Sequence, residues 1–297
     1  MHNSDGSNTA VTVRAYHAPQ SLSTATVLLA QGEAAVIAGG TDLVPQQRTG
    51  SGIWQPVLVS IRRIKALRGV REQAGQLWLG PLTTVSELSC DPLIARYAPV
   101  LARAADCFAS SQIRNAATLG GNICNASPAG DLLVPLMLLD AEVELSCSRD
   151  GVISMRCLPI EEFLVGPGST QRQPAELLTG IRLPLVDAAR IFVFEKFGTR
   201  PALDIATVSV GLLAVAAGDC LQQVRVALGA VAPVVLRARA AEAVLEGRRL
   251  DNEAITAAVA AALAEINPID DVRASGWYRS ELVCNLLTRV LRNAVAA

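Results

Sequence analysis

The stretch VIAGGTDL, residues 36–43, decides the fold, because a short apolar run ends there in the glycine pair Gly39-Gly40. A second pair, Gly120-Gly121, lies in TLGGNI, residues 118–123. Each pair is flanked by Thr and followed by Asp or Asn. Such loops expose backbone N–H groups where no Cβ blocks a ligand, which suits a diphosphate. Two of them predict a dinucleotide held between two loops.

Neither glycine pair fits the two commonest phosphate-binding motifs. The first lacks a correctly spaced third glycine, and no Gly-Lys-Ser or Gly-Lys-Thr follows it, so neither a Rossmann fingerprint nor a P-loop is indicated. Each pair taken alone is equally compatible with a tight turn after a strand. The prediction of a dinucleotide site therefore depends on the two pairs acting together.

Bulk composition narrows the class of protein. The 297 residues are 51% apolar and 18% charged, with a net charge of −1, so a nucleic-acid partner or an anionic membrane is not indicated. The mean hydropathy of +0.35 is high, yet the sequence has no uncharged apolar run of about 18 residues to cross a membrane. We interpret the apolar excess as additional buried surface, including an interface with another subunit.

The terminal segment and the scarce reactive side chains point to a cytoplasmic protein without its own metal. Residues 1–10 are polar and lack a signal core. The seven cysteines form no Cys-x-x-Cys pair, and the two histidines, His2 and His17, lie near the N-terminus. We therefore expect no disulfide framework, metal site, iron–sulfur cluster or histidine catalysis. Cys107 and Cys124 read as small core residues, with a redox role for Cys124 as the alternative.

Apolar patterning and turn signals predict two halves. The first, to about residue 180, has short strands and helices, and the second is an α+β unit of three antiparallel strands and three helices. The boundary is expected near residues 184–190. Predicted strands are 34–38, 57–61, 77–80, 141–147, 192–197, 207–217 and 223–229, and predicted helices are 21–31, one starting at 85, 93–109, 131–139, 237–245, 252–264 and 275–294.

The polar residues in and after the second glycine pair could also bind a ligand. Thr118, Asn122 and Ser127 can donate to phosphate or to a ribitol chain, whereas ionised Asp131 only accepts and suits a ribose hydroxyl. Lys196 lies in an otherwise apolar strand. It either pairs at a solvated edge with Glu195 or Asp204, or places a cation near an electron-rich ring or a carboxylate.

Together these motifs resemble the FAD-binding medium subunits of the molybdenum hydroxylases, the xanthine dehydrogenase and carbon monoxide dehydrogenase family. The resemblance spans about residues 12–293. It is carried by AGGTDL (38–43), GPLTT (80–84), SQIRNAATLGGNI (111–123), ASPAGD (126–131), ELLTGI (176–181), KFGTR (196–200), DIA (204–206) and DVRAS (271–275) with Tyr278-Arg279.

The resemblance implies an α+β fold with two domains. Residues 10–185 would form a two-subdomain FAD-binding domain of the vanillyl-alcohol-oxidase/PCMH type. Residues 190–295 would form an antiparallel three-stranded sheet with a helix bundle, of the CO dehydrogenase flavoprotein C-terminal type, covering the flavin. A related branch inserts a cysteine-rich cluster-binding segment after the second glycine pair. Residues 122–141 are compact and hold one cysteine, so no cluster is expected in this chain.

The resemblance also implies the residues that bind FAD. The two glycine segments would hold the pyrophosphate, Phe108 and Leu178 would lie near the isoalloxazine, Asp131 on the adenosine side, and Lys196 near the reactive edge of the flavin. The full expected set is Val36, Ile37, Ala38, Gly39, Gly40, Thr41, Asp42, Leu43, Leu82, Thr83, Phe108, Ala117, Thr118, Gly120, Gly121, Asn122, Ile123, Ser127, Asp131, Leu178 and Lys196. No catalytic side chain and no metal ligand is expected.

By the same resemblance, the chain is a flavoprotein subunit of an oxidoreductase. It would take electrons from iron–sulfur clusters of a small subunit, which relay them from a molybdenum–pterin centre in a large subunit, and pass them from FAD to an external acceptor. A dimer of heterotrimers is the expected assembly. Two alternatives stay open at this point: a stand-alone FAD-dependent oxidase, and a scaffold subunit without flavin.

Overall fold

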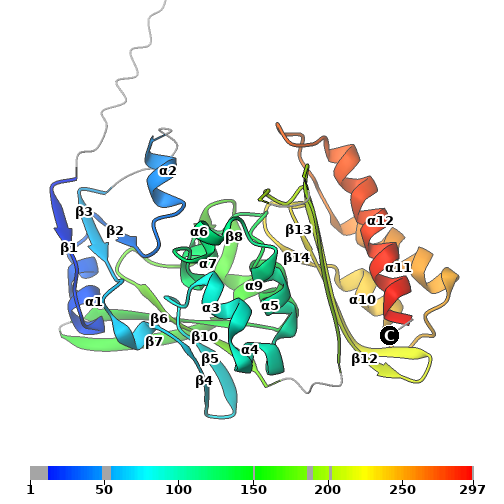
Figure 1. Ribbon diagram of the computed structural model, residues 1–297, viewed down its shortest axis with the longest axis horizontal. Coiled ribbons are helices and arrows are strands. Elements are labelled where there is room, and N and C mark those ends of the chain that lie inside the picture. Colours follow the sequence, from blue (N-terminus) through cyan, green and yellow to red (C-terminus); the bar gives the residue numbers. More distant parts are fainter. Residues whose placement is uncertain (1–12, 49–54, 150, 186–189, 201–202, 296–297) are drawn as a thin grey trace, which may run out of the picture.

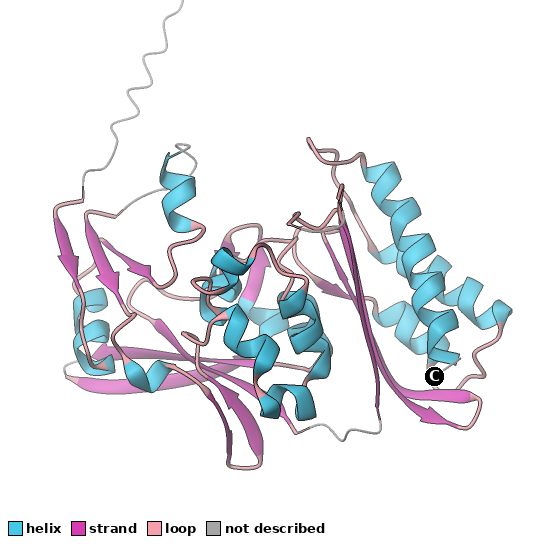
Figure 2. Cartoon of the chain, viewed as in Figure 1, coloured by secondary structure: helices cyan, strands magenta, loops and turns pink. Residues whose placement is uncertain are grey.

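The computed structural model describes residues 13–48, 55–149, 151–185, 190–200 and 203–295. The polar segment 1–10, on which the cytoplasmic expectation depends, lies outside these ranges. The described strands form three larger sheets and one two-stranded sheet. Figure 1 shows the larger sheets with helices against them, and the secondary-structure colours of Figure 2 separate the helical layers from the strands. None of the described helices is long and apolar enough to cross a bilayer.

The first sheet is parallel and carries the first glycine pair at its end. Its strand order is β1-β3-β2, and Ile37 of β2 lies beside Ser60 of β3. The α1 helix begins at Ser21, whose side chain accepts a hydrogen bond from the Thr24 N–H. The elements are β1 (Ala15–His17), α1 (Leu22–Ala30), β2 (Ala34–Ile37), α2 (Leu43–Arg48), β3 (Val57–Ser60) and a 3₁₀ turn at Lys65–Leu67.

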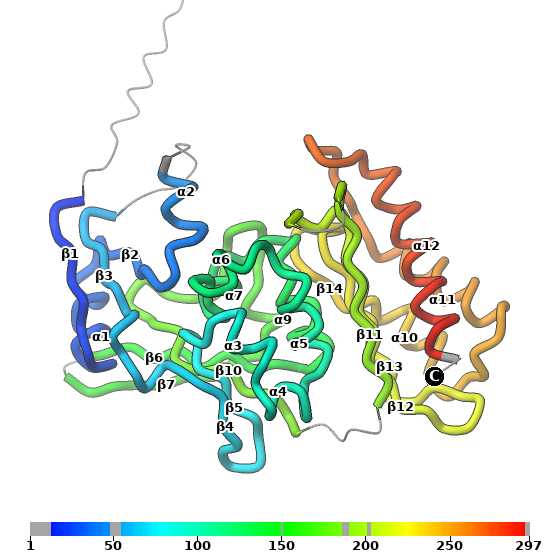
Figure 3. Tube along the Cα trace, in the orientation of Figure 1, coloured from blue at the N-terminus to red at the C-terminus, as the bar shows by residue number. Residues whose placement is uncertain are grey.

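The second sheet is antiparallel, with strand order β4-β5-β10-β6-β7. The trace in Figure 3 shows how β10 returns from far along the chain to lie between β5 and β6. Its strands are β4 (Val70–Gln73), β5 (Gln76–Leu79), β6 (Glu142–Arg149), β7 (Val152–Pro159) and β10 (Leu177–Pro184), with a small pair β8 (Leu164–Gly166) and β9 (Ser169–Thr170).

In the described part of the chain, seven short helices belong to this second region. The single helix expected over 93–109 is wrong: Pro99 ends one helix at the residue before it and starts another, because proline disfavours a helical conformation in the preceding residue. Helix α8 tolerates Pro135 because that residue lies in its first turn. The helices are α3 (Val85–Cys90), α4 (Pro92–Tyr97), α5 (Pro99–Asp106), α6 (Ser111–Arg114), α7 (Leu119–Asn125), α8 (Leu133–Leu138) and α9 (Ile160–Phe163).

The third sheet has four strands where three were expected, because the two-residue strand β14 pairs with β13. Such a short strand leaves no periodic signal in the sequence. The elements are β11 (Arg190–Phe197), β12 (Val208–Ala217), β13 (Cys220–Gly229), β14 (Leu236–Arg237), α10 (Arg239–Leu245), α11 (Asn252–Glu265) and α12 (Gly276–Val295).

Strand β12 is apolar along its length because both faces of the third sheet are covered. Val210 and Leu212 belong to the core shared with α10, α11 and α12, whereas Leu213 belongs to the core of the second region. A Cβ on Gly211 would lie 2.6 Å from Leu138 of α8, so this glycine allows close packing between the two regions. The third sheet is therefore packed directly on the second region of the chain.

A charged cluster fixes the same interface. Asp140, directly after α8, accepts from Arg237 at 2.8 Å and from Arg225 at 2.5 Å. Arg237 also forms a bidentate pair with Glu242. Because both arginines come from the third sheet, the cluster ties that sheet to the end of α8.

Candidate functional site

The first glycine pair forms a turn whose backbone donors are free. Within the described part of the chain, the N–H groups of Gly39, Gly40, Thr41 and Asp42 meet no acceptor. Gly40 has a φ of +72°, which favours glycine, and a Cβ on Gly39 would lie 2.1 Å from the Ala116 carbonyl oxygen. Unused, adjacent backbone donors of this kind form a concavity suited to an anion.

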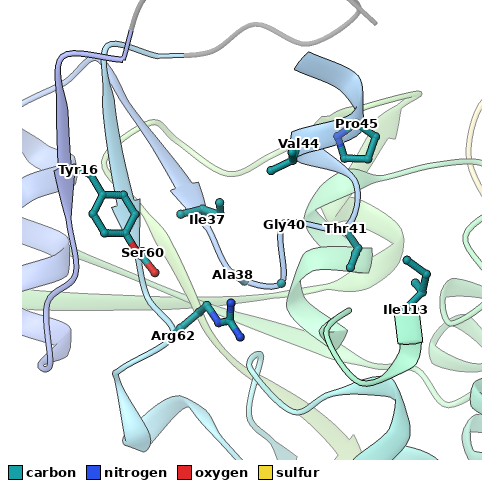
Figure 4. Close-up of a pocket in the computed structure, with 11 residues that line it drawn as sticks. Tyr16, Ile37, Ala38, Gly40, Thr41, Val44, Pro45, Ser60, Arg62 and Ile113 are labelled. Carbon is teal, nitrogen blue, oxygen red and sulfur yellow. The ribbon is translucent and has the colours of Figure 1, made fainter. Parts of the chain in front are cut away.

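A hollow of about 420 Å³ opens beside this turn. Figure 4 shows Arg62 beneath the turn, Tyr16 and Ser60 on one side, and Ile113 on the other. Five of the expected residues line the hollow: Ile37, Ala38, Gly39, Gly40 and Thr41. The hollow falls within the size range of ligand pockets.

The second glycine pair is helical, which corrects the expectation of a second open loop. Thr118 caps α7, and its side chain accepts from the Gly121 N–H at 3.1 Å. The Gly120 N–H donates to the Pro81 carbonyl at 2.8 Å, and the Asn122 N–H donates to the Thr118 carbonyl. These backbone donors are therefore used inside the protein, unlike those of the first pair.

Gly120 instead allows two segments to pack closely. A Cβ there would lie 2.5 Å from Pro81 Cβ, and the Leu119 N–H donates to the Thr83 carbonyl at 3.0 Å. Segment 80–84 thus supports the start of α7, and the expected residues on these two segments lie in the interior. The buried ones are Leu82, Thr83, Ala117, Thr118, Gly120 and Ile123.

Three buried side-chain oxygens near the two segments lack a hydrogen-bond partner: Gln47 Oε1, Asn122 Oδ1 and Asp131 Oδ1. Buried polar atoms in native proteins are nearly always paired, so each of these requires an explanation. Gln46 connects the segments, since its Nε2 donates to Asp42 Oδ2 at 2.5 Å and to Asn125 Oδ1 at 3.2 Å. The helix after the first turn is thereby held against the end of α7.

Lys196 is buried and paired, which rules out the solvated-edge interpretation. Its Nζ lies 2.6 Å from Asp131 Oδ2 and donates to the Cys107 carbonyl at 3.2 Å. Glu195 pairs with Arg289 instead, and Asp204 accepts from Thr199. Because Lys196 and Asp131 meet at one point, the expectation that they serve different ends of a cofactor cannot hold for both.

The environment of Asp131 shifts its titration. Burial raises the pKa of its carboxyl from 3.8 to about 6, and the neighbouring Lys196 opposes that shift. Partial burial also raises the pKa of Asp42 above its ordinary range. Both acids are therefore easier to protonate than exposed carboxyls.

The remaining expected residues lie around this centre. Phe108 is half-buried and its carbonyl accepts from Arg114 at 2.9 Å, while the Ser127 hydroxyl accepts from the Ala129 N–H at 3.3 Å. Leu178 is buried in the core of the second region, so its side chain is turned away from solvent. Val36 and Leu43 flank the first turn and are half-buried.

The cysteine within α7, Cys124, is chemically unreactive. Burial raises the pKa of the Cys124 thiol to about 11, so it stays protonated at neutral pH. Cys107 contributes its carbonyl to Lys196. Within the described ranges, no three His, Cys, Asp or Glu side chains gather to hold a metal ion.

Six residues that line the hollow were not predicted from the sequence: Tyr16, Val44, Pro45, Ser60, Arg62 and Ile113. A usable signal was present for Arg62. Adjacent parallel strands end at the same edge of a sheet, so the residues that follow β3 lie beside those that follow β2. Pairing the two predicted strands in parallel would have placed Arg62 near the glycine turn.

Comparison with known proteins now identifies the family. Residues 9–186 match the FAD binding domain in molybdopterin dehydrogenase, and residues 193–294 match the CO dehydrogenase flavoprotein C-terminal domain. The chain belongs to the FAD-binding medium subunits of the molybdenum hydroxylase family. The expected family, fold class and cofactor are confirmed.

Individual relatives cover nearly the whole medium subunit. The carbon monoxide dehydrogenase medium chain of Hydrogenophaga pseudoflava is 32% identical, over 95% of this chain and 96% of its own. The xanthine dehydrogenase FAD-binding subunit of Escherichia coli is 31% identical with the same two coverages. The structure of the Hydrogenophaga pseudoflava dehydrogenase lacking the Mo-pyranopterin moiety superposes with a TM-score of 0.90, at 32% identity, over 95% and 96% of the two chains.

The residues of this medium subunit fit FAD. Free N–H groups at Gly39–Asp42 suit its diphosphate. Gly39 lies so close to the Ala116 carbonyl that no side chain fits at this position. The unpaired Asn122 and Asp131 oxygens suit the hydroxyl groups of ribitol or ribose. The observed groups therefore supply both kinds of partner that a dinucleotide requires.

Proposed function

We propose that this medium subunit holds FAD at the turn 39–42 and at α7, receives electrons from an iron–sulfur partner subunit, and passes them to an external acceptor. The observation that carries the proposal is the row of four unused backbone donors, together with two buried oxygens that have no partner, Asn122 Oδ1 and Asp131 Oδ1. The unpaired N–H donors match the oxygens of a diphosphate, and the unpaired side-chain oxygens match hydroxyl groups. FAD contains both kinds of group.

The proposed roles follow from where each residue lies. Gly39, Gly40, Thr41 and Asp42 donate to the diphosphate, flanked by Val36, Ile37, Ala38 and Leu43. Asn122 and Asp131 accept from cofactor hydroxyls, and Ser127 adds a further hydroxyl partner. Lys196 holds Asp131 in place. Phe108 and the backbone at Leu178 lie toward the isoalloxazine. Leu82, Thr83, Ala117, Thr118, Gly120 and Ile123 support the binding segments from the interior, and Gly121 lies at the exposed start of α7.

The chain itself binds, orients and excludes water, and FAD when bound supplies an electron carrier that exchanges electrons with other redox centres. The described residues that line the hollow include no histidine, cysteine or glutamate. The lining therefore favours binding over proton transfer. This division of work assigns electron handling to the subunit and leaves substrate chemistry to another chain.

We further infer that the subunit works in a cytoplasmic complex with an iron–sulfur small subunit and a molybdopterin-binding large subunit, as a dimer of heterotrimers. Support comes from relatives whose names make them chains of carbon monoxide and xanthine dehydrogenases. Related medium subunits thus serve enzymes named for unrelated substrates. Such variety is expected if the medium subunit transfers electrons and does not bind the organic substrate.

The relay is tested by co-expressing the chain with its neighbouring subunits and measuring reduction anaerobically. With organic substrate, we expect bleaching of both flavin and iron–sulfur absorbance in the wild-type complex. A complex carrying Gly39→Ala should bleach only its iron–sulfur absorbance and should fail to reduce an external acceptor. A chain that oxidises a substrate by itself would favour a stand-alone oxidase. A complex that turns over fully without flavin would favour the scaffold interpretation.

A further inference from the structure

Arg62 is a cation at the candidate FAD site to which no role has been given. It lies two residues after β3, on the floor of the hollow beneath Ala38 and Gly40 (Figure 4). Among the described residues that line this hollow, it is the one arginine or lysine. Its guanidinium contacts no carboxylate or carbonyl in the described part of the chain. The charge is therefore available to a ligand.

Two cations that the structure describes near the binding segments already have partners. Lys196 is paired with Asp131, and the Arg114 guanidinium donates to the Phe108 and Ala109 carbonyls and to Ser111. The turn 39–42 offers N–H dipoles but no full positive charge, and Asp42 at its end carries a negative one when ionised. Among the described residues that line the hollow, Arg62 is therefore the one that could supply a positive counter-charge to a diphosphate bound at this turn.

Guanidinium suits this task. Its planar set of N–H donors matches phosphate oxygens, and a charge-assisted hydrogen bond is roughly twice as strong as a neutral one. The hollow is open on one side, so Arg62 keeps the conformational freedom to reach a bound diphosphate, while Tyr16 and Ile37 offer apolar surface beside it.

We propose that Arg62 is the positive partner of the FAD diphosphate, acting together with the N–H groups of the turn 39–42. The proposal rests on the proposed function, because it assumes that FAD binds at this turn. Arg62 would then determine the affinity for the dinucleotide, although it lies outside the two glycine motifs.

The test measures FAD binding to the full chain freed of flavin, by quenching of flavin fluorescence. Arg62→Met should raise Kd by about 10- to 100-fold, which corresponds to about 1.4–2.7 kcal/mol. Arg62→Lys should recover part of that loss, because it restores the charge without the fork of donors. Arg63→Met is the matched control: Arg63 is the adjacent exposed arginine, does not line the hollow, and should change Kd less than about twofold.

Salt dependence gives a second readout that a merely structural role would not change. Raising the sodium chloride concentration should weaken FAD binding more steeply in the wild type than in Arg62→Met, because screening acts on the charge pair. Equal affinities and equal salt slopes for Arg62→Met and Arg63→Met would overturn the inference and leave the proposed function intact. A wild-type chain that binds no FAD would instead contradict the proposed function itself.

Discussion

Lys196 Nζ lies 2.6 Å from Asp131 Oδ2, and both side chains are less than a tenth exposed. The pair joins β11 of the C-terminal sheet to the loop between α7 and α8 in the FAD-binding half. A buried ion pair contributes little net stability, but removing one partner leaves an uncompensated buried charge. The pair therefore couples the position of the C-terminal sheet to the loop beside the binding site.

Lys196→Met should lower the free energy of unfolding by about 3 kcal/mol at neutral pH, because Asp131 would remain buried without its cation. The double variant Lys196→Met/Asp131→Asn should be more stable than Lys196→Met alone, since it carries no buried charge. Urea unfolding of the flavin-free chain measures both effects.

The neighbouring pair on the same strand is the control. Glu195 pairs with Arg289, whose side chain is 60% exposed. Glu195→Gln should cost less than about 1 kcal/mol, because exposed pairs are weak. Equal losses for Lys196→Met and Glu195→Gln would contradict the special position of the buried pair.

Asp131 should also make stability depend on pH in a defined direction. Its pKa is raised from 3.8 to about 6, so between these values the folded chain holds a proton that the unfolded chain has lost. The stability that this group contributes is present below about pH 4 and is lost as pH rises to about 6, by at most about 3 kcal/mol. Asp131→Asn removes this titration.

Thermal or urea unfolding of the flavin-free chain across that pH range measures the effect. The stability of the wild type relative to Asp131→Asn should fall as pH rises, while the other acids affect both proteins alike. Parallel pH profiles for the two proteins would show that Asp131 is not shifted upward.

Gly39→Ala should abolish FAD binding, with Kd raised at least about 100-fold. The new Cβ would lie 2.1 Å from the Ala116 carbonyl, so the turn that carries the free N–H groups would have to move. Gly166→Ala is the matched control, because its Cβ would lie 3.8 Å from the nearest atom, Ser169 Cβ. Fluorescence titration with FAD measures both variants, and full flavin occupancy of Gly39→Ala would count against the turn as the diphosphate site.

Asn122→Leu should have opposite effects on stability and on binding. Removing a buried oxygen that has no partner should leave the flavin-free chain as stable as the wild type, or more stable by about 1 kcal/mol, while FAD affinity falls by about tenfold. Asn125→Ala, by contrast, removes an acceptor that Gln46 uses and should destabilise the flavin-free chain by about 1 kcal/mol. A destabilised Asn122→Leu chain with normal FAD affinity would make Asn122 a structural residue.

Much of this site could be predicted from local sequence patterns. Both glycine pairs were recognisable, and so were strand 34–38, which ends in the first turn, and its neighbour, strand 57–61. The helical start at the second pair could also have been read, because Thr118 stands three residues before Gly121 in the manner of a helix cap. That reading would have shown that only the first pair keeps its backbone donors free.

Contacts between residues far apart in the chain could not be predicted from the sequence. Lys196 and Asp131 are separated by 65 positions, and their contact depends on how β11 packs against the loop after α7. Burial of Leu178 likewise depends on β10 lying between β5 and β6. Hydrophobic periodicity in the sequence does not predict which strands pair. Charge partners of this kind become visible only once the sheets are assembled.

The most direct test of the central claim is the cofactor content of the purified chain. The protein is denatured, and the released small molecule is identified by mass and quantified by absorbance against the protein concentration. The account predicts FAD at about one per chain in the wild type and none in Gly39→Ala. A colourless wild-type chain that takes up no FAD, alone or with its partner subunits, would contradict it.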